Sequence, residues 1–352
     1  MKEKSSRVRA IKEIEVLDIG DGDYQPKTTP DEFRRFIYEH KSKAMVDKRM
    51  DVRTAVKKFI KNGVSIAIGG CSFVRLPMAV VHEMIRQNVK NLTMVAGTRT
   101  FDLNLLLDNG CIKHLEIGYI VGMEVFGIPR LTRKKVEDAI ARGELTINEW
   151  DNASMAWRHK AAGMGLPFLP VRNMMGSDGF RRSGGIKIRC PFTGEELVLV
   201  PAIYTDVAVV HVHEADIYGN CRIYGAINED WGKMRGAKRL IITTERIIDT
   251  DEIRREPEKT FLPYFYVDAV VEVPYGAHPT NMPKMYYLDI DHIKEYMNAS
   301  RDPSGKALKE YYEKYIFGVD SFEEYLEKIG GKEKLKYLED LERQRKNVDG
   351  EH

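Results

Sequence analysis

The sequence predicts an α/β fold in which an open, mostly parallel sheet carries helices on both faces. Short apolar runs rich in β-branched residues, such as Val64–Ile68 and Leu92–Val95, alternate with amphipathic segments such as Met78–Gln87. Parallel strands joined by helices are covered on both faces, and each crossover is right-handed. The length of 352 residues is sufficient for a large core.

The other helices and strands are predicted in the same way, from amphipathic segments and from short apolar runs. A capped helix is predicted to start at Thr29–Pro30–Asp31, and a second helix spans Val52–Ile60. Further helices are predicted at Arg133–Ala141 and Ser154–Ala162, and further strands at Val207–His213, Leu240–Thr244 and Tyr266–Val273. Two β-hairpins interrupt the alternation, one joining Ile186–Arg189 to Glu196–Val200 and one joining Val207–His213 to Cys221–Tyr224.

Beyond Asp289 the chain becomes charged and aromatic, which predicts helices at Ile293–Met297, Ala307–Ile316 and Phe322–Arg343. We therefore expect three parts: a helical leader at residues 1–61, an α/β domain at residues 62–289, and a helical C-terminal extension at residues 290–352, packed on the body.

The segment from Asn62 to Pro77 is the most informative. A buried strand ends at Ile68 and is followed by Gly69 and Gly70, which can adopt backbone angles closed to other residues. Pro77 suits the first turn of a helix. The pattern predicts a tight corner whose free N–H groups, at a helix N-terminus, would bind a carboxylate, an oxyanion or a phosphate.

Composition excludes several classes of partner. With 55 basic and 53 acidic side chains the formal net charge is +2, so bulk electrostatics do not favour nucleic acid or an anionic membrane. The N-terminal segment lacks the apolar run that is typical of a signal peptide. No apolar stretch of the sequence is long enough to span a membrane. The cysteines are spaced without a CxxC pair, which favours free thiols in a reducing cytoplasm and no metal site: Cys71, Cys111, Cys190 and Cys221.

Three further features could carry chemistry. The irregular loop from Gly163 to Asp178 has the length of a functional or mobile loop, although a structural excursion is equally compatible with it. His211 and His213 point the same way from a strand, but without a third ligand we expect core histidines. Glu124 is flanked by apolar residues, so desolvation would raise its pKa toward that of a general base; a buried, hydrogen-bonded acid is the alternative.

Four blocks of the chain resemble one family. The four blocks occur in the order found in family I coenzyme A transferases. They are the Asn62–Pro77 segment, the loop from Gly163 to Asp178, the segment His211–Asn220 with its acidic strand end and Tyr–Gly–Asn turn, and the segment Val271–Thr280. The resemblance covers an entire α subunit of the glutaconate type. Cys71 stands where an aromatic residue is usual in that family, and Arg75 where a glycine is usual.

The resemblance implies the α subunit of a hetero-oligomeric CoA-transferase that uses coenzyme A as co-substrate and no metal. Its substrates would be an acyl-CoA and a carboxylic acid, and the β subunit would supply the covalent glutamate, because the family's Ser–Glu–Asn–Gly segment is absent here. The residues expected to bind substrate are Gly69, Gly70, Cys71, Ser72, Arg75, Ser177 and Asp178.

Two alternatives remain open from the sequence. Some relatives of this subunit pair resemble hydrolases that cleave rings or carbon–carbon bonds, and such chemistry would use Glu124 as the base. A non-catalytic or isomerase-like domain that binds sugar phosphates is a further alternative, and it would bind phosphate without a β subunit.

Overall fold

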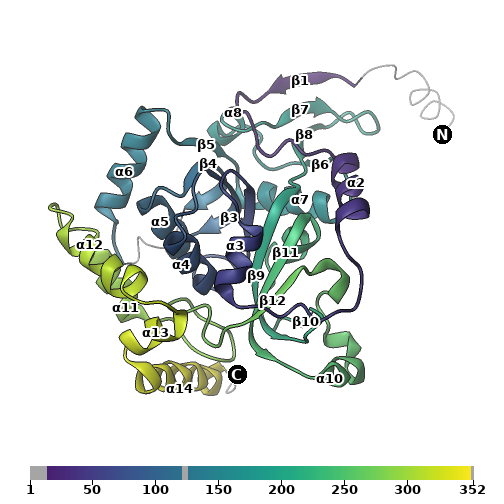
Figure 1. The fold of residues 1–352 in the computed structure, drawn as a ribbon. Helices are drawn as coiled ribbons and strands as arrows, with labels where there is room; N and C mark the ends of the chain where they lie inside the picture. The colour runs from purple at the N-terminus through teal and green to yellow at the C-terminus, as the bar shows by residue number, and fades with distance from the viewer. Residues whose placement is uncertain (1–13, 121–125, 350–352) are drawn as a thin grey trace.

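The computed structural model describes residues 14–120 and 126–349 and contains two sheets (Figure 1). The larger sheet has eight strands, in the order β12-β11-β9-β2-β3-β4-β5, with β10 paired antiparallel to β9. The smaller has four, in the order β1-β7-β8-β6. The strands are β1 (Val16–Ile19), β2 (Ser65–Ile68), β3 (Leu92–Arg99), β4 (Ile112–Ile120), β5 (Thr146–Glu149), β6 (Phe168–Val171), β7 (Ile186–Arg189), β8 (Glu196–Pro201), β9 (Thr205–Ala215), β10 (Cys221–Arg222), β11 (Ala237–Ile247) and β12 (Ala269–Glu272).

The seven strands from β12 to β5 pair in parallel, which confirms the predicted α/β sheet. The helices are α2 (Pro30–His40), α3 (Val52–Phe59), α4 (Met78–Arg86), α5 (Phe101–Asp108), α6 (Arg130–Ala141), α7 (Asn152–Gly163), α8 (Asp178–Arg181), α9 (Asp230–Arg235), α10 (Thr250–Arg255), α11 (Ile290–Ala299), α12 (Lys306–Tyr312), α13 (Phe322–Lys328) and α14 (Gly331–Asp349). The predicted cap of α2 is present, since Thr29 accepts from the backbone N–H of Glu32 and the Glu32 side chain reaches back to Thr29.

Alternate residues of the central strands enter two different hydrophobic cores. Val207 and Val209 of β9 face the core formed with α3, α4, α5 and the C-terminal helices. Ala208, Val210 and Val212 face the core formed with α7, α9 and the small sheet. Because side chains alternate across a strand, this distribution is what a sheet buried on both faces requires.

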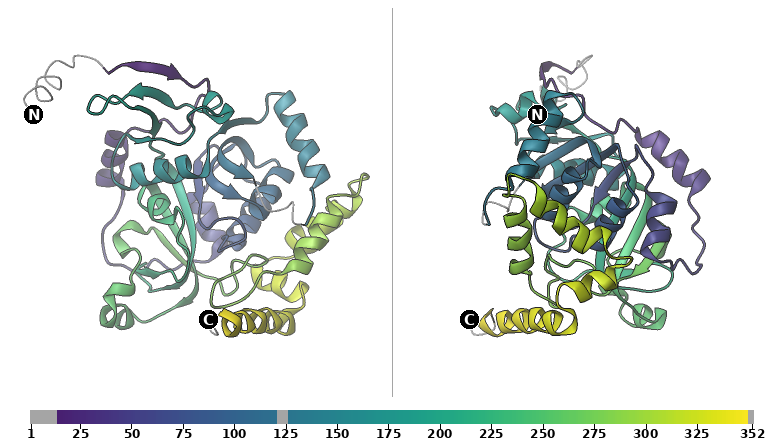
Figure 2. Two further views of the ribbon diagram at one scale, coloured as in Figure 1. Left: turned by 180° about the vertical axis from the view of Figure 1, so that it is seen from behind. Right: turned by 60° about the vertical axis from the view of Figure 1, so that its left-hand side comes forward.

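The small antiparallel sheet lies at the opposite end of the molecule from α14 (Figures 1 and 2). Its β7–β8 pair is the first predicted hairpin, and the short β9–β10 pair is the second. The leader region was predicted to be helical, but it also contributes β1, which pairs with β7. Its four residues are too few for a period to be recognised in the sequence. The four cysteines are free, as predicted.

The C-terminal helices differ from the prediction in one respect. A single helix over Phe322–Arg343 was expected, but α13 and α14 are separate helices. Gly330, before α14, and Gly331, its first residue, have φ of +122° and +57°, angles that interrupt a right-handed helix.

Buried histidines join this extension to the body. His82 of α4 contacts the rings of Phe322 and Tyr325, with centroids 5.5 and 4.7 Å apart. Neither imidazole nitrogen of His82 has a hydrogen-bond partner among the described residues. Burial, reinforced by Arg86, holds the pKa of His82 well below its usual value of 6.5. His82 is therefore neutral in the folded protein.

We predict that acid weakens the fold through this residue. The unfolded chain binds a proton at His82 below about pH 6.5 and the folded chain does not, so stability is complete above that pH and falls below it. His82→Phe keeps an aromatic ring in place and should reduce the stability lost between pH 7.5 and 5.5 by about 1.4 kcal/mol, measured by urea unfolding.

His40 provides the matched control, because its side chain is 56% exposed. His40→Gln should leave the difference in stability between the two pH values unchanged. An H82F protein that loses as much stability as the wild type would show that His82 does not contribute to the acid sensitivity.

Candidate functional site

The chain turns sharply where β2 ends, and this Gly69–Gly70 corner is the centre of the candidate site. Gly70 has φ of +73°, and a Cβ atom placed on it would lie 2.3 Å from the carbonyl oxygen of Val74. A Cβ on Gly69 would lie 3.0 Å from Val210 of the neighbouring strand β9. Gly70 therefore requires glycine, as the sequence predicted, whereas a side chain at Gly69 would be crowded against β9.

The N–H groups of the corner are not free, contrary to the expectation from sequence. Gly69 donates to the carbonyl of Val209 at 2.7 Å and Gly70 to Oδ1 of Asp230 at 2.9 Å. Cys71 donates to the carbonyl of Val74 at 3.1 Å, and Ser72 to that of Thr98 at 3.2 Å. The reason is that the chain folds back on itself before α4 begins at Met78, so the corner is not a helix N-terminus.

Arg99, at the end of β3, fixes the carbonyl side of the same corner. Its Nη1 donates to the carbonyl oxygens of Ile68, Gly69 and Gly70 at 3.0 to 3.1 Å. The guanidinium is fully buried and paired with the equally buried Asp102. One side chain therefore holds three consecutive carbonyls in a single arrangement.

Arg75 has a structural position and is not offered to substrate. Its side chain has no exposed surface, and Nη2 lies 2.8 Å from Oδ2 of Asp230 and donates to the carbonyl of Ala226 at 2.6 Å. Asp230 in turn accepts from the N–H of Gly70. The expectation that Arg75 recognises a substrate carboxylate does not fit this geometry, because its charge is already paired.

Cys71 and Ser72 are half-buried, and the part of the chain that the structure describes holds no hydrogen-bond partner for the Ser72 hydroxyl. Thr100 donates through Oγ1 to the carbonyl of Ser72, which fixes the backbone there. Glu124 lies in 121–125, outside the described residues. Of the residues predicted to bind substrate at the corner, Cys71 and Ser72 are thus the ones whose side chains remain available to contact a ligand.

The predicted irregular loop from Gly163 to Asp178 contains the strand β6, which pairs with β8, so the expectation of a continuous loop was wrong. A chain of contacts connects the corner with the segment between β6 and α8. Ser72 donates to the carbonyl of Thr98, whose hydroxyl donates to Oδ1 of Asn152, the first residue of α7. The neighbouring Asp151 accepts from Asn173 at 2.8 Å. Ser177 and Asp178 are exposed at the start of α8, and the Ser177 hydroxyl donates to the carbonyl of Met174. No hydrogen bond or ion pair among the described residues joins Ser177 or Asp178 to the corner itself.

Sequence reasoning missed the charged residues that support the corner: Arg99, Asp102, Glu229, Asp230 and Lys233. Lys233 donates to the carbonyl of Gly70 at 3.4 Å and lies 3.1 Å from Oε2 of Glu229. Adjacent acids shortly after a turn are the only sequence signal at Glu229–Asp230, and such pairs are common on protein surfaces.

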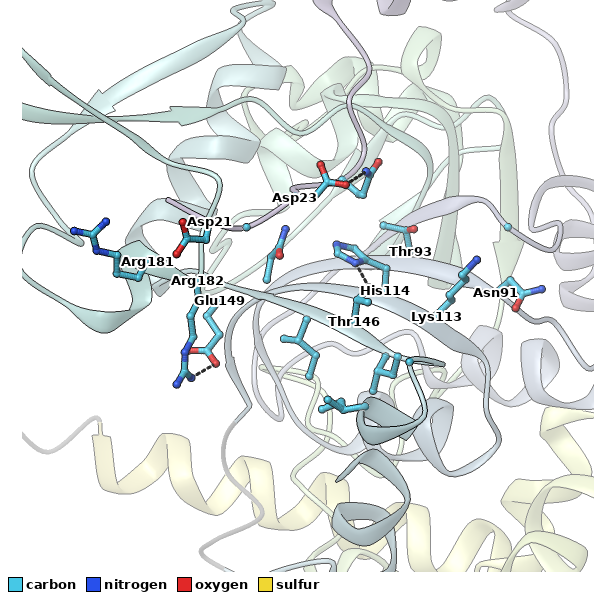
Figure 3. Close-up of a pocket in the computed structure, with 18 residues that line it drawn as sticks. Asp21, Asp23, Asn91, Thr93, Lys113, His114, Thr146, Glu149, Arg181 and Arg182 are labelled. Carbon is cyan, nitrogen blue, oxygen red and sulfur yellow. Dashed lines mark hydrogen bonds and ion pairs between the residues drawn. The ribbon is translucent and has the colours of Figure 1, made fainter. Parts of the chain in front are cut away.

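A large cavity, of about 1,100 Å³, lies elsewhere (Figure 3). It includes Gly63 and Asn91, which precede β2 and β3, so it opens at the amino ends of these strands. Across its floor, Thr93, His114 and Thr146 are cross-strand neighbours. Ligands of open α/β sheets bind at the carboxyl ends of the strands, so the corner is the better candidate for the catalytic site.

Beneath this cavity His114 donates through Nε2 to Glu116 at 2.8 Å, and its Nδ1 is hydrogen-bonded to the Thr146 hydroxyl at 2.6 Å. Burial alone would raise the pKa of Glu116, but Arg158 and the hydrogen bond from His114 lower it below its usual value. Trp150 and Asn148 also donate to Glu116. The carboxylate is therefore a satisfied structural anion.

A family model described as coenzyme A transferase matches residues 49–273, which include the corner and its supporting charges. The chain belongs to the coenzyme A transferase family. It is 34% identical over 303 residues to the A subunit of the glutaconate CoA-transferase of Acidaminococcus fermentans, covering 81% of this chain and 92% of that protein.

Two further similarities have different consequences. The crystal structure of the Acidaminococcus fermentans glutaconate coenzyme A-transferase superposes with a TM-score of 0.76 at 32% identity, over 83% of this chain and 95% of that one. The cholesterol ring-cleaving hydrolase IpdA subunit of Rhodococcus jostii is 29% identical, over 78% of this chain and 93% of that protein. The first confirms the predicted fold, and the second shows that relatives differ in reaction.

Within residues 14–120 and 126–349, no group of three or more histidine, cysteine or acidic side chains is arranged to hold a metal ion. No helix in that part of the chain is long and apolar enough to cross a membrane.

We predict that Asp230→Ala will destabilise the protein by about 3 kcal/mol or more. The substitution leaves the buried guanidinium of Arg75 without its counter-charge and the N–H of Gly70 without its acceptor. Chemical unfolding measures the loss. Glu137→Ala is the control, because Glu137 pairs with Arg133 at 60% exposure, where removal should change stability by less than about 0.5 kcal/mol. A loss for D230A no larger than for E137A would contradict the supporting role of Asp230.

Proposed function

We propose that this chain is the α subunit of a heteromeric CoA-transferase that moves CoA from an acyl-CoA to a carboxylic acid. The observation that carries this proposal is the similarity to the glutaconate CoA-transferase subunit over 81% of the chain, which includes the Gly69–Gly70 corner. The corner lies at the carboxyl end of β2, where open α/β sheets bind their ligands. Coenzyme A is the co-substrate, and the proposed chemistry uses no metal.

The covalent glutamate comes, in this proposal, from a β subunit. In the described part of the chain the acids nearest the corner are paired: Asp102 with Arg99, Asp230 with Arg75, and Glu229 with Lys233. A carboxylate that is held by a buried cation is a poor nucleophile, because its charge is already stabilised. The similarity to a protein named as one subunit of a transferase supports the same conclusion.

The reaction then proceeds by exchange at the partner's glutamate. A carboxylate oxygen of that glutamate attacks the thioester carbonyl, the carbon–sulfur bond breaks, and CoA leaves as a thiolate. The thiolate attacks the glutamyl carbonyl of the resulting anhydride and releases the first carboxylic acid, which leaves a glutamyl-CoA thioester. The acceptor carboxylate reverses these steps and leaves as the new acyl-CoA.

This chain contributes a rigid wall to the reaction site. Gly69 and Gly70 allow the tight turn that brings Cys71 and Ser72 to the end of β2, and in this proposal the side chains of Cys71 and Ser72 contact the substrate carbonyl. Arg75 acts as a positioning residue through Asp230. Ser177 and Asp178, exposed beyond the loop that connects to Asn152, would contact the acceptor or the β subunit. The protein is expected in the cytoplasm, where its four thiols remain free.

A hydrolase subunit is the second candidate, favoured by the similarity to the ring-cleaving hydrolase subunit. In that case Glu124 would act as the base, and no covalent glutamate would form.

We predict that co-expression with a β subunit of the family will give a complex that transfers CoA from an acyl-CoA to an added carboxylic acid. Borohydride or hydroxylamine treatment during turnover should modify a glutamate of the partner, detected by mass spectrometry. Glu124→Gln should leave transfer intact, since the nucleophile belongs to the partner.

The opposite pattern of results would show that the complex is a hydrolase and not a transferase. Release of free acid and free CoA without any modified glutamate, abolished by E124Q, would establish the hydrolase. Binding of sugar phosphates by the chain without a partner would contradict both.

A further inference from the structure

A second cavity, of about 470 Å³, opens beside the Gly69–Gly70 corner. It lies between α7 and the segment that leads into α9, and its main lining residues are Trp157, Lys160, Asn228, Glu229 and Trp231. Glu229 accepts from the N–H of Gly97 in β3 and contacts Lys233, which also donates to the carbonyl of Gly70. Lys233 thus connects the corner with Glu229, a residue that lines the cavity.

The carboxylate of Glu229 is held in place with one oxygen left over. Its Oε2 accepts from Gly97 at 3.2 Å and lies 3.1 Å from Nζ of Lys233. Oε1 has no hydrogen bond among the described residues, and it packs so closely on Gly97 that a Cβ there would lie 1.9 Å from it. Only 11% of the Glu229 side chain is exposed, so its carboxylate is held in one position and Oε1 remains as a fixed hydrogen-bond acceptor.

A second observation at the same carboxylate is an unpartnered buried imidazole. His159 of α7 is 1% exposed, and its Nε2 has no hydrogen-bond partner in the described chain, although it lies 4.0 Å from Oε2 of Glu229. Burial, reinforced by Lys233, holds the pKa of His159 well below its usual value, so the ring is neutral. Buried polar atoms are rarely left unpaired in folded proteins.

The walls of the cavity are aromatic. Two of the three tryptophans of the chain line it, and Trp157 is 40% exposed. The ring of Trp231 packs against Gly163 at the end of α7, where a Cβ would lie 2.5 Å from the ring. Lys160 also lines the cavity, with its ammonium 4.9 Å from the centroid of the Trp157 ring. Aromatic walls and a fixed carboxylate acceptor whose charge is already balanced by Lys233 suit uncharged ligands that carry N–H or O–H donors.

We propose that this cavity binds an uncharged, hydrogen-bond-donating part of the acyl-CoA substrate, with Glu229 Oε1 as the acceptor and the indole of Trp157 as the apolar surface. The inference rests on the proposed function. Two parts of the substrate have this chemistry, namely the pantetheine arm with its amides and hydroxyl, and a hydroxylated acyl group.

The test compares the variants Glu229→Ala and Trp157→Ala with the wild type, each in complex with the β subunit. Each should raise KM for the acyl-CoA roughly tenfold, the effect of losing a hydrogen bond to a charged group or an aromatic contact. KM for the carboxylic acid acceptor should stay within about twofold, a separation that general damage to the fold would not produce. Phe192→Ala, at a residue that is 78% exposed on the β7–β8 hairpin, is the control.

The two sources are distinguished by varying the acyl group. An equal rise in KM for all acyl-CoA donors identifies the pantetheine arm, whereas a rise confined to hydroxylated donors identifies the acyl group. An unchanged KM for every acyl-CoA in both active variants overturns the inference and leaves the transferase function standing.

A complex that transfers CoA to no acceptor would instead contradict the proposed function. The inference is then decided by calorimetric titration of the same complexes with CoA and with pantetheine. Weakening of about tenfold in E229A or W157A relative to F192A supports the cavity as the binding site, and equal affinity overturns it. Glu229→Gln, which keeps the size of the side chain, replaces E229A if that variant fails to fold.

Discussion

The contact between Arg99 and the end of β2 is the constraint on which the candidate site depends. Three consecutive carbonyl oxygens, of Ile68, Gly69 and Gly70, accept from one guanidinium nitrogen. Lys233 also donates to the Gly70 carbonyl, at 3.4 Å. Loss of Arg99 would leave that oxygen with this one long hydrogen bond and would remove the charged donor from the other two carbonyls, at a cost of roughly 1–3 kcal/mol each. Asp102 compensates the charge of Arg99, so the corner is held by a neutral pair within the core.

A second pair, Arg75 with Asp230, holds the corner from its amide side. Asp230 is the first residue of α9, and the preceding Glu229 faces the cavity beside the corner. The same short segment thus fixes the Gly69–Gly70 corner and presents a side chain to the proposed substrate pocket. Burying these two ion pairs is costly. In return, they hold the backbone of the corner in a single conformation at the place where the substrate is proposed to lie.

The sequence allowed the fold to be predicted but only part of the site. The strand at Val64–Ile68 and the helix at Met78–Gln87 were recognisable because period and composition agreed, and the observed bounds of each differ by one residue at one end. The strand β4, with Lys113 and His114 near its start, was not recognised, because polar and charged residues interrupt its apolar residues. The partners of these side chains, as in the hydrogen bond between His114 and Glu116, become evident only in the folded structure.

The corner itself was predictable because two adjacent glycines after an apolar run are typical of a strand that ends in a tight turn. Its hydrogen bonding was not, since the acceptors Asp230 and Thr98 and the donor Arg99 are brought to it by tertiary structure. Arg75 illustrates the difference: a lone arginine beside a glycine corner suggests anion binding, whereas its full burial against Asp230 gives it a structural role.

The division of each central strand between two cores limits how this protein can change. Shifting β9 by one residue would exchange the side chains of its two faces, sending Val207 and Val209 into the space now filled by Ala208 and Val210. Single-residue insertions or deletions in β9 are therefore incompatible with either core. Changes in length are expected to be tolerated in connections such as the turn at Pro191–Gly194, which belongs to neither core.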